Sequence, residues 1–325
     1  NYLGQLFLEA RKVIAGKEDQ YANCSAERAS IHSFREQYAS RIRTLRMTDI
    51  GFEDYYLLHD LCCHKTGTGN PDQFYVREAL RIAYLFAIYN DGKLNKLYRL
   101  YPRKFVDYLK GFDTIFTTNY DSNVDSVVEK TVYHIHGQFD KLASVYDRTS
   151  LRNQLPDAPI RDCTIDPSYL YLYSNALSTH CGEYKELQVK QYSLANAALE
   201  KLVDSYRSNQ KARAEIDNWV RNENTITANM GYAVQIKAQH PELTFTDNYH
   251  FEELHQIAGE LEVLGLSPWN DFHIFEAIDQ SAIKSCTFYY YSEEQCQKVI
   301  SLLPRISQKG SLHFLSAQEF WRTVT

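Results

Sequence analysis

The segment 112–138 limits the fold of this chain more than any other, because two short apolar runs in it each give way to polar residues. Apolar side chains recur over 112–116, and most residues of 131–135 are β-branched or aromatic. This pattern predicts a strand, a short helix over 122–129 and a second strand. Gly137 ends the second strand with a residue that can adopt a positive φ. A crossover of this kind favours two parallel strands and therefore an α/β fold.

Three polar residues, Asn119, Asp121 and His136, follow these two strands. Open parallel sheets bind ligands in the crevice beyond the carboxyl ends of their strands, so these side chains are the candidate site. Two plainer interpretations stay open. Asn119 and Asp121 are residue types that close turns, and His134 and His136 alternate along a strand as metal ligands can. No nearby motif supplies further metal ligands, so we expect no metal and expect His134 to be buried and hydrogen-bonded.

Three blocks of sequence agree in their order and in their positions after strands: TTNYD at 117–121, HIHG at 134–137 and LEVLGLSPWNDFHIFEAI at 261–278. Together they resemble the motifs of the sirtuin-like superfamily, especially the bacterial sirtuin-like and abortive-infection H-type antiphage defence proteins. The agreement of three blocks is more specific than any one short motif.

The resemblance implies a Rossmann-like parallel sheet with large helical insertions, that is, a sirtuin-like core lacking the zinc module. We expect one such domain over 1–325. Within it a helical part, 1–110, precedes a core formed by 111–140 and 260–325, and a helical insertion occupies 141–259.

In the sirtuin-like family the motif Asn and the histidine before glycine lie around the nicotinamide ribose of NAD+. By resemblance, Asn119 and His136 are the catalytic candidates. His136 would accept a proton from the ribose, and Asn119 would position a water molecule or the ribose hydroxyls. The resemblance also implies cofactor-binding roles for Thr118, Asp121, Gly137, Gly265, Ser267 and Asp271. Asp271 has a plainer interpretation as the N-cap of the helix that follows it.

Two features depart from the sirtuin pattern. The glycine-rich loop that cradles a pyrophosphate after the first strand is missing, so we expect such a strand and turn upstream of Asn1 in the natural protein. The seven cysteines contain no Cys-x-x-Cys pair, so the four-cysteine zinc module of protein deacylases is missing as well. The second departure favours NAD+ hydrolysis over lysine deacylation.

The resemblance therefore implies a NAD+ hydrolase that releases nicotinamide and ADP-ribose and depletes NAD+ in antiphage defence. Such an enzyme must be silent in a healthy cell, which implies a homo-oligomer, a partner ATPase or a phage-derived activator. The alternative is a noncatalytic nucleotide-sensing or scaffold module of a defence complex.

Composition limits the classes of ligand and the cellular compartment that we expect for this protein. The net charge is −6 with dispersed basic residues, which argues against nucleic acid as the primary ligand. No apolar run approaches the roughly 20 residues that span a bilayer. The odd number of cysteines, seven, lacks a disulfide framework and is typical of a reducing compartment. We therefore expect a cytoplasmic protein.

The return of apolar residues predicts the remaining elements. The expected helices span 2–15, 26–45, 51–63, 74–90, 95–109, 184–222, 248–259, 270–280 and 293–303, with a last helix through Trp321. Later strands are expected to begin at Leu261, Ser285 and Leu312. Residues 140–167 predict a long loop, either a lid or a linker, and 168–182 are a candidate pocket wall.

Overall fold

The computed structural model describes residues 2–16, 20–22, 25–68, 72–142, 166–177, 197–223, 225–241 and 249–325. Residues 143–165 of the expected lid or linker lie outside the described residues. So do residues 178–196, which include parts of the expected pocket wall and of the helices expected over 184–222.

The chain divides into two compact units. The first unit comprises Asn1–Gln138, Ala176–Glu186 and Tyr249–Thr325, and the second comprises Phe139–Asn175 and Leu187–Asn248. The second unit overlaps the helical insertion expected over 141–259.

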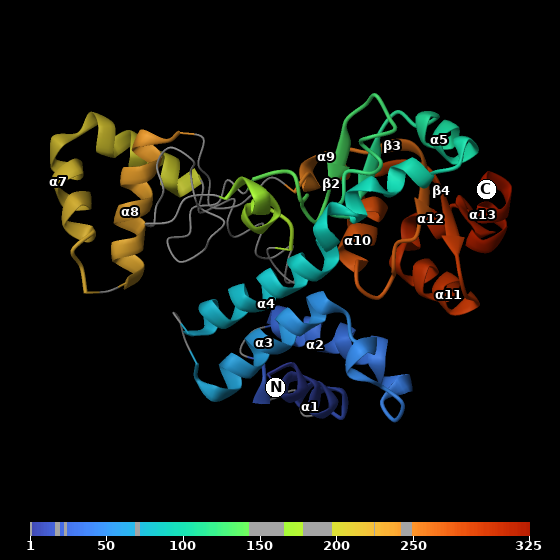
Figure 1. The fold of residues 1–325 in the computed structure, drawn as a ribbon, viewed down its shortest axis with the longest axis horizontal. Coiled ribbons are helices and arrows are strands. Elements are labelled where there is room, and N and C mark those ends of the chain that lie inside the picture. Colours follow the sequence, from blue (N-terminus) through green and yellow to red (C-terminus); the bar gives the residue numbers. More distant parts are fainter. Residues whose placement is uncertain are drawn as a thin grey trace. The chain divides into compact units, whose positions relative to one another are not determined.

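Helices form the N-terminal part of the first unit, drawn in blue and cyan in Figure 1. Its elements are α1 (Tyr2–Ile14), α2 (Ser25–Tyr38), η2 (Ala39–Arg41), η3 (Met47–Asp49), α3 (Phe52–Thr66), α4 (Asp72–Tyr89), η4 (Asn90–Gly92), η5 (Leu94–Leu100) and α5 (Arg103–Lys110). Helix α1 contacts both α2 and α3, because Leu6, Ala10 and Val13 recur every three or four residues and are buried. Their burial with Ile31 and Leu58 gives these helices a core of their own.

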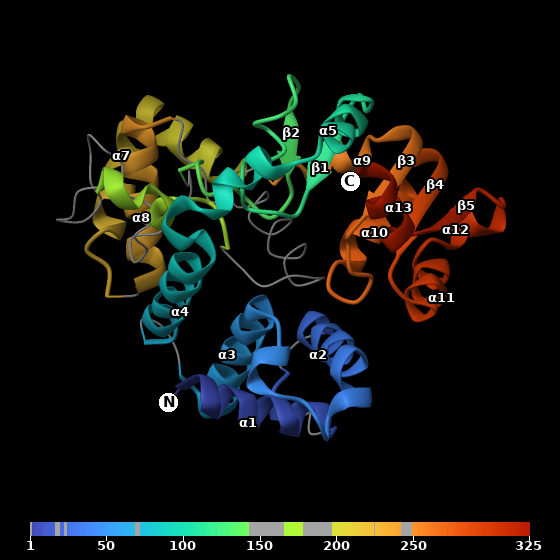
Figure 2. The ribbon, with the colours of Figure 1, turned by 45° about the vertical axis from the view of Figure 1, so that its right-hand side comes forward.

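The predicted pair of parallel strands is confirmed. Strand β1 (Ile115–Thr117) pairs in parallel with β2 (Val132–His134), and Thr117 lies opposite His134. Figure 2 shows the two strands side by side. The carboxyl ends of both strands therefore lie at the same edge, and Asn119 and His136 follow them in the sequence.

The prediction of a short helix over 122–129 is wrong. That segment forms only turns and a bend, with two isolated helical bonds, from the Ser126 amide to the Ser122 carbonyl and from the Val128 amide to the Val124 carbonyl. The Asp121 carboxylate accepts from the amide of Asn123, and the Asn123 side chain donates to the Leu94 carbonyl. These side-chain bonds offer the backbone a turn in place of a helix, so the crossover between β1 and β2 is irregular.

The second strand also ends earlier than expected. The amide of Ile135 still donates to Thr117 at 2.9 Å, but residues 135 and 136 form a turn. His134 and His136 therefore do not alternate along one strand. Gly137 adopts a φ of 93°, as its position after the strand predicted.

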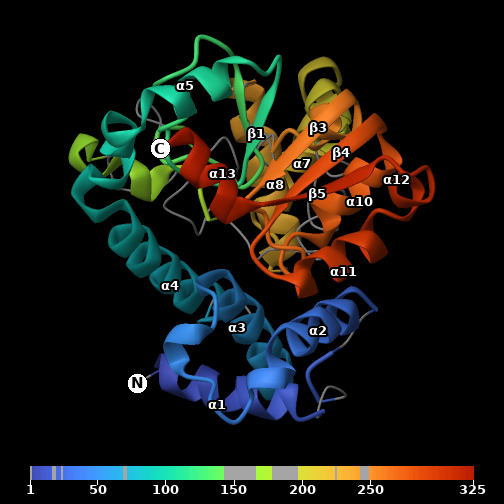
Figure 3. The same ribbon diagram turned by 90° about the vertical axis from the view of Figure 1, so that its right-hand side faces the viewer.

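A second sheet carries the C-terminal part of the first unit. Its strands are β3 (Ala258–Leu264), β4 (Ala282–Tyr290) and β5 (Leu312–Ser316), all parallel in the order β3-β4-β5. Figure 3 shows these three strands together. The accompanying helices are α9 (Phe251–His255), α10 (Phe272–Gln280), α11 (Glu293–Leu302), α12 (Pro304–Gln308) and α13 (Ala317–Val324).

One hydrophobic cluster joins the two sheets. Ile135, just past β2, is buried in the same cluster as Val263 of β3, Phe275 of α10 and Phe288 of β4. Parallel strands with buried apolar residues and intervening helices confirm the α/β class, although the described strands form two small sheets. The cluster brings the end of β2 close to the loop between β3 and α10.

Several predicted helices differ from the observed ones. The helix expected over 95–109 is instead two elements, η5 and α5, which are separated at Pro102. Proline interrupts the helix because it lacks an amide proton and disfavours a helical conformation in the residue before it. The helix expected over 26–45 ends at Tyr38, and the one expected over 248–259 is the short α9. Helix α12 was not predicted.

The second unit is helical in its described part. Its elements are η7 (Pro167–Tyr173), a helix over 197–208, α7 (Gln210–Trp219) and the unpredicted α8 (Thr225–Gln239). Asn209 begins α7 by accepting from the amides of Lys211 and Ala212. Leu199, Ile216 and Val234 share a buried cluster, so this unit has a separate core.

Among the described residues, no helix combines the length and the apolar character needed to cross a membrane.

Candidate active site

The described site centres on His136, which is 4% exposed and lies between two carboxylates. Its Nδ1 atom is 3.7 Å from Oε1 of Glu53, and its Nε2 atom is 3.4 Å from Oδ1 of Asp271. The ring of His273 lies nearly parallel to that of His136, with centroids 6.3 Å apart, and the Tyr120 ring centroid lies 6.5 Å away. A buried imidazole with acidic groups on both sides can accept a proton and keep the resulting positive charge compensated.

Asp271 is brought to His136 by the third sequence block. It occupies the N-cap position of α10, but its side chain makes no capping hydrogen bond. Its backbone carbonyl instead accepts from the amide of Ile274, and its own amide donates to Ser267. Asp271 therefore occupies the N-cap position that was predicted, but its side chain does not make the capping hydrogen bond that such a position implies.

Gly265 and Ser267 form the turn between β3 and Asp271. Gly265 directly follows β3 with a φ of 77°, a value that favours glycine. The Ser267 hydroxyl lies 3.4 Å from the Trp269 amide, and its carbonyl accepts from the Asp271 amide. The strand, glycine turn and helix expected from the sequence are all present, and a cofactor role for the two residues remains a prediction.

Asn119 and its neighbour Thr118 follow β1 at the same edge as His136. The Asn119 side chain is exposed, its amide donates to Thr117 Oγ1, and its carbonyl accepts from His134 Nδ1 at 2.9 Å. The backbone of Asn119 is thus fixed between the two strands while its side chain faces solvent. Thr118 is half-buried.

His134 and Asp121 serve the structure of this edge. His134 is buried, donates to Asn119 and has its Nε2 atom 3.0 Å from Asp125 Oδ2, which confirms the predicted hydrogen-bonded histidine. Asp121 is buried and accepts from both the amide and the side chain of Asn123. These bonds match the turn-closing interpretation of Asp121, and its cofactor role remains a prediction.

Glu53 is a site residue that the sequence analysis missed. It lies in the first turn of α3, far from the three blocks in sequence, and it accepts a hydrogen bond from the Tyr120 hydroxyl. Acidic residues are common in the first turn of a helix, where they interact favourably with the helix dipole. The sequence therefore carried no signal that separated Glu53 from an ordinary helix start.

Asp54, next to Glu53, adds a second acid to this part of the site. Burial, together with the carboxylates of Glu53 and Asp271, raises the pKa of Asp54 to about 7, against the lowering effect of the hydrogen bond donated by Tyr38. That bond is 2.6 Å long. Asp54 therefore titrates near neutral pH, well above an ordinary aspartate.

Among the described residues, one group could offer three atoms to a metal ion: His136, Asp271 and His273, whose candidate ligand atoms lie within 4.8 Å of one another. The His134 and His136 pair considered from the sequence does not form this group, because His134 contacts Asn119 and Asp125 instead.

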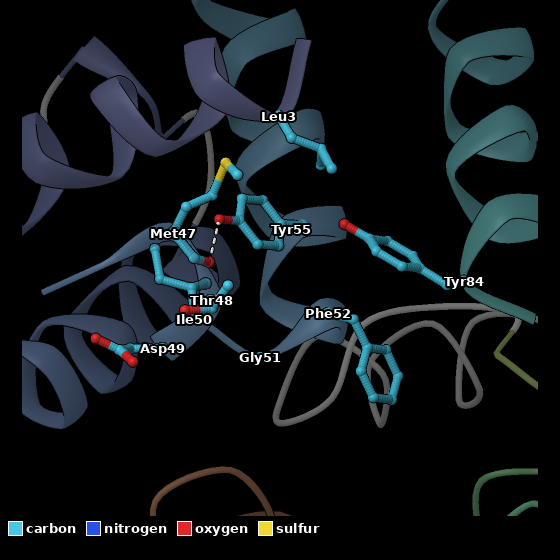
Figure 4. A pocket seen from close by; sticks show the side chains of 9 residues that line it. All are labelled: Leu3, Met47, Thr48, Asp49, Ile50, Gly51, Phe52, Tyr55 and Tyr84. Atoms are coloured by element: carbon cyan, nitrogen blue, oxygen red, sulfur yellow. Dashed lines mark hydrogen bonds between the residues drawn. The ribbon is translucent and has the colours of Figure 1, made fainter. Parts of the chain in front are cut away.

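A hollow of about 450 Å³ lies in the helical part of the first unit. It is lined by Leu3, Met47, Thr48, Asp49, Ile50, Gly51, Phe52, Tyr55 and Tyr84. Figure 4 shows the Tyr55 hydroxyl donating to the Met47 carbonyl on one wall, with the Tyr84 ring on another. The hollow borders Gly51 and Phe52, which directly precede Glu53.

Comparisons with family models, with curated proteins and with solved structures found no match for this chain. The resemblance to sirtuin-like proteins therefore remains a prediction from the three sequence blocks.

Proposed function

We propose that this protein is a NAD+ hydrolase that releases nicotinamide and ADP-ribose. One observation carries the proposal: His136, two residues after the end of β2, is buried between the carboxylates of Glu53 and Asp271. It lies past the carboxyl end of a parallel strand pair, where open α/β sheets bind ligands. Asn119 follows the neighbouring strand, so both proposed catalytic residues belong to one edge of the pair.

The proposed reaction breaks the bond between nicotinamide and ribose and consumes one water molecule. Nicotinamide leaves with the bonding electrons, which leaves an oxocarbenium-like ribose. His136 accepts a proton from a ribose hydroxyl, and the two carboxylates stabilise the imidazolium that forms. Asn119, which carries no charge, orients the water that attacks the ribose. The proton that this water loses restores the ribose hydroxyl, and the imidazolium of His136 releases the proton that it accepted. The net products are nicotinamide, ADP-ribose and one proton.

We further propose that the activity serves antiphage defence by depleting NAD+, and that a homo-oligomer, a partner ATPase or a phage-derived activator controls it. Support for this role comes from the sequence resemblance alone. A burst of NAD+ loss in cells that express the protein, seen only after phage infection, is the expected result.

A measurement of nicotinamide release by the full-length protein tests the proposed NAD+ hydrolase activity. The assay compares the wild type with Asn119→Ala and His136→Ala. We expect each variant to lose at least about a hundredfold in rate, because general base catalysis by His136 and the positioning of water by Asn119 each contribute on that order. His313, an exposed histidine of β5, provides the matched control His313→Ala, which should keep wild-type activity.

Circular dichroism must show that all variants are folded. No release from the folded wild type, at high concentration and with candidate activators, would favour the noncatalytic nucleotide-sensing or scaffold module. Binding of NAD+ without turnover, measured by calorimetry, would then identify the nucleotide-sensing form.

A further inference from the structure

We propose that Glu53 is a positioning residue that orients His136 for the reaction, an inference that rests on the proposed function. Glu53 contacts His136 Nδ1 through Oε1, and the same oxygen accepts the hydrogen bond of Tyr120. Tyr120 directly follows Asn119. One carboxylate from α3 therefore contacts both segments that carry the proposed catalytic residues.

The start of α3 is fixed on both sides of Glu53. The amide of Gly51, just before the helix, donates to the Tyr38 hydroxyl at 3.0 Å, and that hydroxyl donates to the Asp54 carboxylate at 2.6 Å. Tyr38 is 1% exposed and belongs to the core of the helical part. A buried tyrosine thus anchors the residues flanking Glu53, so the position of its carboxylate is set by the core of α1 to α3.

The two carboxylates around His136 act on opposite ring nitrogens. Asp271 lies at Nε2 and Glu53 at Nδ1. A partner on one nitrogen sets the orientation and the tautomer of an imidazole, and thereby decides which nitrogen can exchange a proton. Glu53 thus acts on the reaction through His136. The helical N-terminal part is then a component of the site, in addition to any role in assembly.

The substitution Glu53→Gln distinguishes a positioning role of the Glu53 charge from a contribution of Glu53 to packing alone. Glutamine has the same shape and keeps an oxygen that can accept from Tyr120, so the local structure is retained. What it removes is the negative charge beside His136. The matched control is Glu262→Gln, because Glu262 of β3 also accepts hydrogen bonds from tyrosines, Tyr108 and Tyr289.

Steady-state kinetics of nicotinamide release by the full-length protein provide the first test. We expect Glu53→Gln to lower kcat by about tenfold to a hundredfold, as a misoriented base does, while KM for NAD+ changes by less than about twofold. Glu262→Gln should match the wild type. An unchanged kcat in Glu53→Gln, or an effect on KM alone, would overturn the inference while leaving the proposed function in place.

Imidazole ¹⁵N spectra of histidine-labelled protein provide a second readout that needs no turnover. The signals of His136, assigned by their loss in His136→Ala, should shift in Glu53→Gln and stay in place in Glu262→Gln. If the wild type releases no nicotinamide and the His136 signals still shift, the proposed function fails and the positioning contact stands. If those signals do not shift, Glu53 does not position His136.

Discussion

The buried carboxyl group of Asp54 makes the stability of the fold depend on pH. An aspartate in an unfolded chain loses its proton near pH 4 (about 3.9), whereas burial raises the pKa of Asp54 to about 7 in the folded protein. Between these values the folded state holds one proton more than the unfolded state. The free energy of unfolding therefore decreases as the pH rises through this window, by up to about 1.4 kcal/mol per pH unit from this group.

Asp54→Asn should remove this decrease, because asparagine keeps an oxygen for the Tyr38 hydroxyl and does not ionise. Urea unfolding at several pH values between about 4.5 and 8 measures the effect. We expect a flatter pH dependence in the variant and a higher relative stability at the alkaline end. Asp113→Asn, at an exposed aspartate, serves as the control, and the same slope in Asp54→Asn and wild type would contradict the expectation.

At the scale of elements, Gly259 marks an irregularity in β3. The register between β3 and β4 shifts between Gly259 and Glu260, and Gly259 has a φ of 86°. A Cβ atom at Gly259 would meet nothing within 4 Å, so a substitution there meets backbone strain and no clash. Positive φ is costly for alanine and less costly for asparagine.

We therefore expect Gly259→Ala to lower the free energy of unfolding by more than about 1 kcal/mol, and Gly259→Asn to lower it by less. Denaturant unfolding of the wild type and the two variants measures which substitution lowers the free energy of unfolding more. Equal losses for alanine and asparagine would show that backbone strain at Gly259 is not the cause.

Strands and their polar ends could be predicted from the sequence, and element boundaries in the crossover could not. Apolar runs that stop abruptly located β1 and β2, because their periodicity is a local property. The segment between them failed to form a helix because the side chains of Asp121 and Asn123 bind the backbone, Asn123 through a carbonyl of distant Leu94. A contact of that kind depends on the tertiary structure and leaves no local pattern.

At the scale of the whole molecule, the candidate site is assembled from segments that are distant in sequence. His136 and Asp271 could be found because both belong to blocks that follow strands. Glu53 could not, because its contact with His136 arises only when the N-terminal helices and the strand pair fold into one unit. The sequence therefore predicted the part of the site that lies on the sheet and missed the part contributed by α3.

The two compact units have separate cores, so a cavity made in one core should destabilise that unit and leave the other unit stable. Val234 of α8 lies in the core of the second unit, and Val299 of α11 lies in a core of the first; both are 0% exposed. Replacing either by alanine should cost about 2 kcal/mol, the usual range for lost core methyl groups. Because the same change is made on a helix in each unit, the two variants are controls for one another.

Hydrogen exchange followed by mass spectrometry can localise the loss. We expect Val234→Ala to speed exchange in α7 and α8 and to leave β3 and β4 protected, and Val299→Ala to have the opposite pattern, because local openings follow cooperative units. Faster exchange in both units from either variant would mean that the two cores unfold together. Nicotinamide release should then be impaired more by Val299→Ala, since the candidate site lies within the first unit, whose core that variant weakens.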